Sequence, residues 1–192
     1  MGLPPRLHAI AEQVLAGRPM ADVGTDHALL PAALVRTGWV PSAIAMDVAN
    51  GPLKNAKTTL EGLEHSVDVR QSDGLNELSP GEVATICICG MGGATMAGIL
   101  ERGRDVWMNA DRLVLQPQGM PERVRQLMLD SGWDSVLAVV VEDRQKLFTI
   151  EAWESVPAIA GWSELDQRWG RLIRSRPSLL FLKALDRERK QL

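Results

Sequence analysis

The chain has 192 residues, 45% of them hydrophobic, which indicates one globular domain with a sizeable core and room for a small appendage. Its formal net charge of −3 excludes the overall basic character typical of many nucleic-acid-binding proteins. No stretch approaches the roughly 20 consecutive apolar residues of a membrane-spanning helix, and no charged leader precedes a long apolar run. We therefore expect a cytoplasmic protein without membrane contact.

The charge is distributed unevenly along the chain. Residues 166–192 hold eight Lys or Arg and three acidic residues, net +5, whereas residues 1–165 hold 13 basic and 21 acidic residues, net −8. A basic tail on an acidic body predicts a surface for a polyanion, although a solvated helix face is the commoner source of such a run.

Apolar residues at helical spacing predict a first helix that ends before Gly17 and Pro19, and Met20–Val23 reads as the first strand. The segment that follows this strand, G-T-D-H-A-L-L-P, predicts a turn into a second helix over residues 28–36. All later motifs of the chain also stand at the ends of predicted strands.

The turn after the first strand carries the first functional signal. Asp22 and Gly24 match the start of a dinucleotide-binding fingerprint, but Asp26 and Ala28 occupy the positions of its second and third glycines. A carboxylate at Asp26 disfavours a pyrophosphate on the next helix and suits a cationic ligand. S-adenosylmethionine carries a sulfonium and no phosphate, so the turn favours it over NAD. The alternative is that Asp26 only caps a helix beginning at His27.

Two more acidic residues follow predicted strands, over residues 42–48 and 67–71. Asp47 lies at the spacing at which dinucleotide folds place a ribose-binding carboxylate, and Asp73 follows the next strand, although Asp47 could simply be a turn residue. Because open α/β sheets bind ligands outside the carboxyl ends of their strands, we expect Asp22, Asp47 and Asp73 to converge on one crevice.

A fourth strand over residues 84–88 continues through Cys89 into G-M-G-G at residues 90–93. The glycines either expose backbone amides to a ligand or simply permit a turn. Cys87 and Cys89 share a strand face, so they pack or line a pocket and do not form a disulfide. With three scattered histidines and no C-x-x-C, no metal site is expected.

The remaining elements define the fold class. Helices are predicted over residues 52–62, with Asn50 as the N-cap, and over 94–102, 121–131, 164–174 and 178–190; strands are predicted over 113–116, 135–141 and 147–153. Five βα units followed by two adjacent strands predict an α/β fold, a class I methyltransferase (Rossmann-like) sheet with helices on both faces and a short helical C-terminal appendage. The expected division is a cofactor-binding domain, 1–157, and a basic helical extension, 158–192.

Five motifs in order and spacing carry a family resemblance: A-D-V-G-T-D-H-A-L-L-P, A-M-D-V-A-N-G-P, S-D-G-L, I-C-G-M-G-G and L-Q-P-Q. Together they resemble the bacterial tRNA adenine-N1 methyltransferases that modify adenine 22, over about residues 3–155. The E-D-R-Q-K-L-F-T-I segment is also similar, with Phe148 where the family pattern leads us to expect tyrosine. Gln118 stands where that pattern usually has asparagine, and the chain is short in the family's helical carboxyl domain.

The resemblance implies transfer of a methyl group from S-adenosyl-L-methionine to N1 of an adenine in tRNA. It implies a cofactor pocket in which Asp22, Gly24 and Asp26 shape the methionine end, Asp47 holds the ribose, and Asp73 and Gly74 meet the adenine. The loop Gly90, Met91, Gly92 and Gly93, with Gln116 and Pro117, would border the place where the target base and the sulfonium meet.

The chemistry of the implied reaction selects candidate catalytic residues. The methylated base is cationic, so a nearby carboxylate would stabilise it, and we expect this role for Asp26, with His27 as a second candidate. Arg168, Arg171 and Arg174 of the tail are the candidates for binding tRNA phosphates. Three alternatives stay open: a methyltransferase of the same fold acting on a small molecule or protein, a nicotinamide-dependent reductase, and a non-catalytic RNA-binding module. The oligomeric state is not predicted.

Overall fold

A computed structural model describes residues 2–156 and 161–189 of the chain. Its seven strands form one sheet in the order β3-β2-β1-β4-β5-β7-β6, in which the first five are parallel and β7 runs antiparallel to both of its neighbours. The strands are β1 (Met20–Val23), β2 (Ala43–Asp47), β3 (Val67–Gln71), β4 (Thr85–Met91), β5 (Arg112–Pro117), β6 (Asp134–Asp143) and β7 (Lys146–Glu154). The predicted fold class is confirmed.

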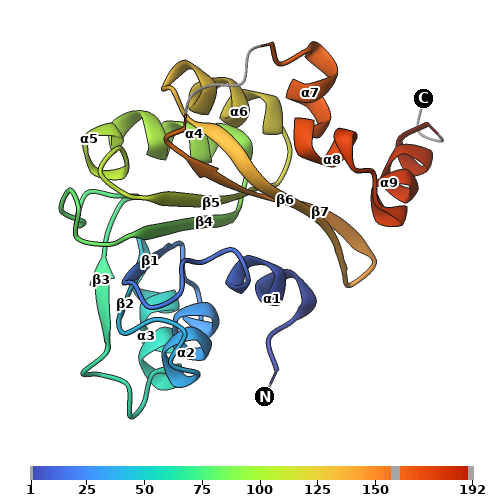
Figure 1. The fold of residues 1–192 in the computed structure, drawn as a ribbon. Helices are drawn as coiled ribbons and strands as arrows, with labels where there is room; N and C mark the ends of the chain where they lie inside the picture. The colour runs from blue at the N-terminus through green and yellow to red at the C-terminus, as the bar shows by residue number, and fades with distance from the viewer. Residues whose placement is uncertain (1, 157–160, 190–192) are drawn as a thin grey trace.

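Helices cover both faces of the sheet (Figure 1). On one face lie α1 (Pro5–Ala11), α2 (Leu29–Arg36) and α3 (Asn50–Thr59); on the other lie α4 (Gly93–Arg102), α5 (Arg104–Trp107) and α6 (Pro121–Asp130). Three further helices, α7 (Glu164–Trp169), α8 (Arg171–Ser175) and α9 (Leu179–Arg189), pack near β6 and α6.

Alternating strand residues supply the two halves of the core. In β1, Ala21 and Val23 belong to the cluster on the α4–α6 side, whereas Met20 belongs to the cluster on the α1–α3 side. This period of two is the normal alternation of a strand buried on both faces. It places Asp22 on the α1–α3 side, between neighbours that are buried there, Ala45 of β2 and Cys87 of β4.

Several predicted boundaries are wrong. The first helix ends at Ala11, and the α5 turn was not anticipated. Asn50 is the first residue of α3 rather than its N-cap, which is Ala49. The helix predicted over 164–174 is divided at Gly170, whose φ of 86° interrupts it. A side chain at Gly170 would lie 2.7 Å from the Glu151 carboxylate, so packing against β7 requires glycine there.

The predicted break at Pro177 is confirmed, because α8 ends at Ser175 and α9 begins at Leu179. The predicted end of the last helix, Lys190, and the predicted division between residues 157 and 158 lie outside the described residues. Within the described part of the chain, no helix is long and apolar enough to cross a membrane.

Candidate active site

The β1–α2 turn is fixed by the strand beside it. The backbone amides of Gly24 and Thr25 both donate to the Met46 carbonyl of β2, at 2.8 Å each. Gly24 has a φ of +75°, and a Cβ there would lie 2.2 Å from the methyl group of Met91 at the end of β4. The positive φ is the reason that glycine is required there, because the Met91 methyl group is the end of a flexible side chain that can move aside.

Beyond Gly24 the backbone is strained. Asp26 and Ala28 have φ values of 50° and 51°, in the left-handed region that non-glycine residues rarely adopt. The helix begins at Leu29, and the Asp26 side chain makes no capping bond to it. The alternative in which Asp26 only caps a helix beginning at His27 is therefore wrong. The Asp26 and His27 side chains are exposed, and His27 Nε2 lies 3.7 Å from Asp26 Oδ2.

Asp22 is the buried carboxylate of the turn, with 7% of its surface exposed. Its pKa is raised to about 6, chiefly by burial and to a smaller extent by the charge of Asp47, against the opposing effects of the Thr25 hydroxyl, which donates at 2.8 Å, and the Arg6 guanidinium. Among the described residues no basic side chain lies within ion-pair distance of Asp22. A cation that entered this site would favour its ionised form.

The other two carboxylates follow the neighbouring strands: Asp47 lies beside the β1–α2 turn, and Asp73 lies farther along the sheet edge. Asp47 lies at the end of β2 and accepts hydrogen bonds from the Ala49 amide at 3.0 Å and the Asp26 amide at 3.5 Å. Asp73 is 63% exposed and pairs with Arg102 of α4 at 3.2 Å. The loop after β3 packs on α4, since a Cβ at Gly74 would lie 2.9 Å from Ile99 of that helix. Asp73 precedes Gly74 in this loop and therefore lies beside Arg102 of α4.

A cavity of about 520 Å³ opens beside Asp22 on the α1 side of the sheet. Its walls come from α1, the β1–α2 turn, the end of β4 and the β6–β7 hairpin, and they include Asp22, Gly24, Asp26 and His27. Neither Asp47, Asp73 nor Gly74 is among its lining residues. Of the three strand-end carboxylates predicted to share one crevice, only Asp22 lines this cavity, together with Asp26 of the following turn.

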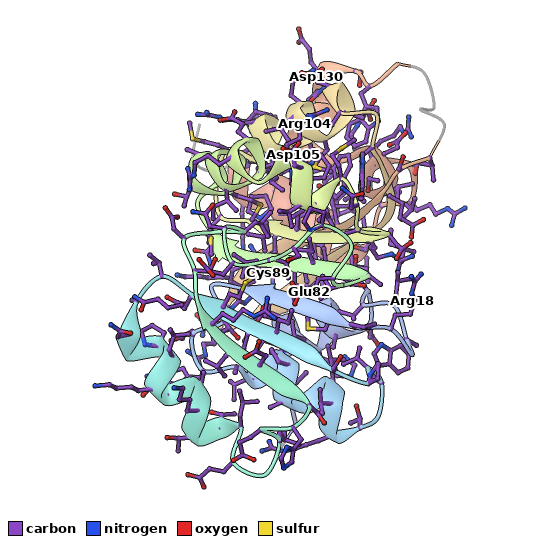
Figure 2. All side chains as sticks on the ribbon, turned by 90° about the vertical axis from the view of Figure 1, so that its left-hand side faces the viewer. Arg18, Glu82, Cys89, Arg104, Asp105 and Asp130 are labelled. Atoms are coloured by element: carbon purple, nitrogen blue, oxygen red, sulfur yellow. The ribbon has the colours of Figure 1, made fainter. Side chains whose placement is uncertain are left out.

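Both cysteines of the chain lie in β4, and Cys89 lines this cavity. Cys87 and Cys89 are both free and face the α1–α3 side, as their spacing predicted, and Figure 2 shows Cys89 at the level of the sheet between the two helical layers. Burial raises the pKa of each thiol well above its ordinary value. Both thiols are therefore neutral and inert as nucleophiles. No group of three potential metal ligands occurs among the described residues.

Backbone hydrogen bonds connect the G-M-G-G loop, residues 90–93, to the Q-P-Q loop, which comprises residues 116–118 and the two residues after them. The Gln118 amide donates to the Met91 carbonyl at 2.7 Å, and the Gly93 amide donates to the Gly119 carbonyl at 3.1 Å. A Cβ at Gly93 would lie 2.5 Å from two carbonyl oxygens of the facing loop, so this glycine allows the two loops to touch. The pair of loops forms one edge of the site.

Gln116 does not offer its amide to a ligand. The side chain is buried, its Oε1 accepts from the Arg6 guanidinium at 2.9 Å, and its own amide donates to the Pro117 carbonyl at 3.2 Å. Gln118, by contrast, is exposed and lines the cavity. Of the two glutamines, Gln118 is the one available to a substrate.

Comparison with known proteins identifies the fold and the family. Residues 3–150 match a family model described as a methyltransferase domain. The chain is 35% identical over 170 residues to the tRNA (adenine(22)-N(1))-methyltransferase of Bacillus subtilis, which covers 88% of this chain and 71% of the relative. The chain belongs to this methyltransferase family.

Solved structures of the tRNA (adenine-N1)-methyltransferase family have the same fold as this chain. The Bacillus subtilis m1A22 tRNA methyltransferase TrmK superposes with a TM-score of 0.92 and 33% identity, covering 99% of this chain and 84% of that one. A Streptococcus pneumoniae protein in complex with S-adenosyl-L-methionine also gives a TM-score of 0.92 and 33% identity, covering 97% and 87%. The resemblance stated from the five motifs is confirmed.

The tail arginines predicted to bind tRNA in this family member are paired within the chain. Arg171 binds Asp134 of β6 at 2.8 Å, and its guanidinium lies over the Trp162 ring. Arg174 pairs with Asp166, and Arg168 with Glu188. Their role in substrate binding stays a prediction, while the structure gives each of them a contact that holds α7–α9 together or to the sheet.

Two residues of the site were missed in the sequence. Arg6 of α1 reaches across to Gln116, and its guanidinium lies 5.4 Å from the centre of the Phe148 ring on β7. Both line the cavity. No spacing rule connects positions 6 and 148, because only the tertiary packing of α1 against the hairpin brings them together.

Proposed function

We propose that this chain transfers a methyl group from S-adenosyl-L-methionine to N1 of an adenine in tRNA, at position 22. The observation that carries the proposal is its 35% identity to the Bacillus subtilis tRNA (adenine(22)-N(1))-methyltransferase over 88% of the chain. The complex of the Streptococcus pneumoniae relative with S-adenosyl-L-methionine supports the choice of cofactor. We also propose that the enzyme acts in the cytoplasm.

The residues at the β1–α2 turn fit this cofactor. Asp22 is a buried carboxyl group whose pKa is raised to about 6, and a cationic ligand offsets that cost of burial. The adjoining cavity of about 520 Å³ is within the range of about 300 to 1,000 Å³ that small-molecule sites occupy. Pyrophosphate would meet Asp22 and Asp26, which argues against a nicotinamide dinucleotide.

We assign the cofactor-binding residues by their strand ends. Asp22, Gly24 and Asp26 would hold the methionine end, Asp47 the ribose, and Asp73 with Gly74 the adenine. Gly90 and Met91 would close the site from β4. For Asp73 this requires its carboxylate to leave Arg102, with which it now forms an exposed ion pair. Such pairs contribute only about 0–1 kcal/mol, so the exchange is inexpensive.

When bound, S-adenosyl-L-methionine supplies a methyl group on a sulfonium, and its transfer leaves a neutral thioether and a cationic adenine. Adenine N1 has an available lone pair, so the protein has to position the base and does not have to deprotonate it. Asp26 is our candidate for stabilising the positive charge that develops on the purine, and His27 is a second candidate. The strained conformation of Asp26 holds its carboxylate at the cavity.

The target base must be released from its stack before it can react. N1 lies on the Watson–Crick edge, so an extruded or loosened nucleotide is required, at a cost of a few kcal/mol. Gly92, Gly93 and Pro117 would border the base. Gln116 would act indirectly, by orienting Arg6 at the cavity wall.

The direct test of the function is incubation with methyl-labelled cofactor and unmodified tRNA, followed by digestion and mapping of the labelled nucleoside. We expect N1-methyladenosine at position 22. Label in a protein or small molecule, or no transfer while tRNA still binds, would favour the alternatives of another substrate or a non-catalytic RNA-binding module.

The role of Asp26 is tested with Asp26→Asn under single-turnover conditions. Loss of a charge near the reacting base, partly screened by solvent, should slow transfer about tenfold or more. Asp105→Asn is the matched control, because Asp105 is an exposed carboxylate on α5, well away from Cys89 in Figure 2. Full turnover by Asp26→Asn would remove Asp26 from the mechanism.

A further inference from the structure

A second cavity, of about 540 Å³, lies next to the one described above. It runs between the Q-P-Q loop, the β6–β7 hairpin and α9. Three residues, Gln118, Lys146 and Phe148, line both cavities. The two cavities are therefore neighbouring compartments of one trough, with Phe148 and Lys146 at the division between them.

The hairpin presents cations that the chain itself does not use. In the described part of the chain, the side chains of Arg144 and Lys146 make no hydrogen bond or ion pair, and both residues are exposed. Arg144 lines the first cavity and Lys146 lines both. This differs from the tail, where Arg168, Arg171 and Arg174 contact carboxylates.

Acidic residues also line the trough, and they restrict where an anion could bind. Asp22, Asp26 and Asp143 line the first cavity, and Glu188 lines the second. Glu188 is paired with Arg168, so its charge is already balanced. Lys146 therefore lies where the two compartments meet, and its ammonium group is available to bind an anion.

The hairpin is held in position by α9. Lys183 donates to both carboxylate oxygens of Glu142, at 2.7 and 2.6 Å, and Arg187 donates to the Gln145 carbonyl at 3.0 Å. Arg144 and Gln145 adopt left-handed backbone conformations, with φ of 47° and 64°, typical of a tight hairpin turn. Arg144 and Lys146 therefore belong to a hairpin whose position is fixed by contacts with α9.

Phe148 supplies a half-buried aromatic wall at the division. The Arg6 guanidinium lies against the ring, 5.4 Å from its centre, and both residues line the first cavity. Aromatic rings next to cationic side chains form the usual platform for an unstacked RNA strand, because every base has a face that can stack.

We propose that the trough binds two consecutive nucleotides of the substrate RNA. The part of the first cavity beside Phe148 receives the target adenine, next to the methionine end of the cofactor at the β1–α2 turn. The second cavity receives the adjoining nucleotide, Lys146 binds the phosphate between the two nucleotides, and Phe148 separates and stacks on the bases. This inference rests on the proposed function. It assigns RNA contact to the hairpin as well as to any surface of the tail.

The phosphate contact is tested by measuring tRNA affinity of Lys146→Ala between 50 and 200 mM salt, with Lys57→Ala, an exposed lysine on α3, as the matched control. One lost phosphate contact should weaken binding and reduce the slope of log affinity against log salt by about 0.7 to 0.9. Lys57→Ala should keep both the salt slope and the cofactor affinity of the unmodified chain, the latter measured by calorimetry.

The stacking role is tested with Phe148→Leu and Phe148→Tyr. Removal of the ring should weaken tRNA binding about fivefold to 150-fold, which corresponds to the 1–3 kcal/mol per stacked base, whereas tyrosine should retain affinity. An RNA with 2-aminopurine beside the target adenine should show quenched fluorescence on binding, and Phe148→Leu should relieve the quenching.

The outcomes separate the two proposals. If the unmodified chain does not methylate tRNA, the proposed function fails. If it methylates tRNA but Lys146→Ala keeps the original salt slope, or Phe148→Leu keeps the original affinity and quenching, the trough is not the RNA site.

Discussion

At the β1–α2 turn the carboxylates of Asp22 and Asp26 face a cavity. Where the C-terminal helices α7–α9 meet α6 and the sheet, by contrast, the charged side chains pair with each other. Asp22 is buried with its pKa raised to about 6, and in the described residues it has no basic partner within ion-pair distance. In the second region, Arg125 of α6 is buried against Glu151 of β7 at 2.8 Å. In the first region the carboxylates are available to a ligand. In the second region the charged side chains pair with each other and hold helices and strands together.

The Arg125–Glu151 pair is the strongest example of structural charge. The Arg125 guanidinium also donates to the carbonyls of Gln167 and Arg168, at 2.7 and 2.8 Å, so it joins α6, α7 and β7. Only 2% and 4% of the two side chains are exposed, so removal of either partner leaves an unpaired charge in the core.

We expect Arg125→Met to lower the free energy of unfolding by about 3–5 kcal/mol, measured by urea denaturation. The double variant Arg125→Met/Glu151→Leu should recover much of the loss, because no charge is then left unpaired. A single variant as stable as the unmodified chain would contradict a structural role for this pair.

Asp22 should behave in the opposite way, since its charge destabilises the unliganded protein. Its folded pKa of about 6 exceeds the ordinary value of 3.8, so its contribution to stability is complete below about pH 4 and is lost as the pH rises through 6. Asp22→Asn cannot ionise. Without cofactor it should be more stable than the unmodified chain at pH 7.5 by up to about 3 kcal/mol, with no gain at pH 4.

Urea denaturation at the two pH values measures this difference. Asp73→Asn, which removes an exposed carboxylate, should change stability at pH 7.5 by about 1 kcal/mol or less. An Asp22→Asn variant that is less stable than the unmodified chain at pH 7.5 would show that the carboxylate is structural after all.

Arg174→Ala should have the smallest effect. Its ion pair with Asp166 is 34% and 12% exposed, and we expect a loss of about 1 kcal/mol or less in the free energy of unfolding. The predicted phosphate contact of Arg174 is tested on the same variant by the salt dependence of tRNA affinity, which should have a smaller slope than in the unmodified chain. An unchanged slope would leave Arg174 with its structural ion pair alone and sharpen the contrast between the two regions.

The sequence predicts the strands of the sheet more accurately than it predicts which partner each charged side chain contacts. All seven strands lie where the sequence predicts strands, most of them from apolar runs, and Gly24 and Asp22 follow from a motif with a local physical cause. The pairing of Arg174 with Asp166, or of Asp73 with Arg102, depends on how helices pack, and net charge along the chain does not contain it. Arg6 and Phe148 were missed for the same reason, since they meet only in three dimensions.

The turn itself shows how far local rules reach. Asp after a glycine and before an apolar run predicts an N-cap, yet Asp26 and Ala28 adopt left-handed conformations and delay the helix to Leu29. The delay leaves the Asp26 carboxylate exposed at the cavity. A propensity rule fails at the residue that we assign to catalysis, as expected where local preference is given up for function.

The central claim is that Asp22, which among the described residues has no basic side chain within ion-pair distance, binds the cationic cofactor. It is tested by calorimetry of S-adenosyl-L-methionine binding between pH 5 and pH 8. Because a bound cation favours the ionised form of a carboxyl whose pKa is about 6, affinity should rise about tenfold from pH 5 to pH 7 and then level off. Asp22→Asn should bind more weakly with no such rise, and Asp105→Asn should follow the unmodified chain. An affinity independent of pH in the unmodified chain, or unchanged in Asp22→Asn, would contradict the claim.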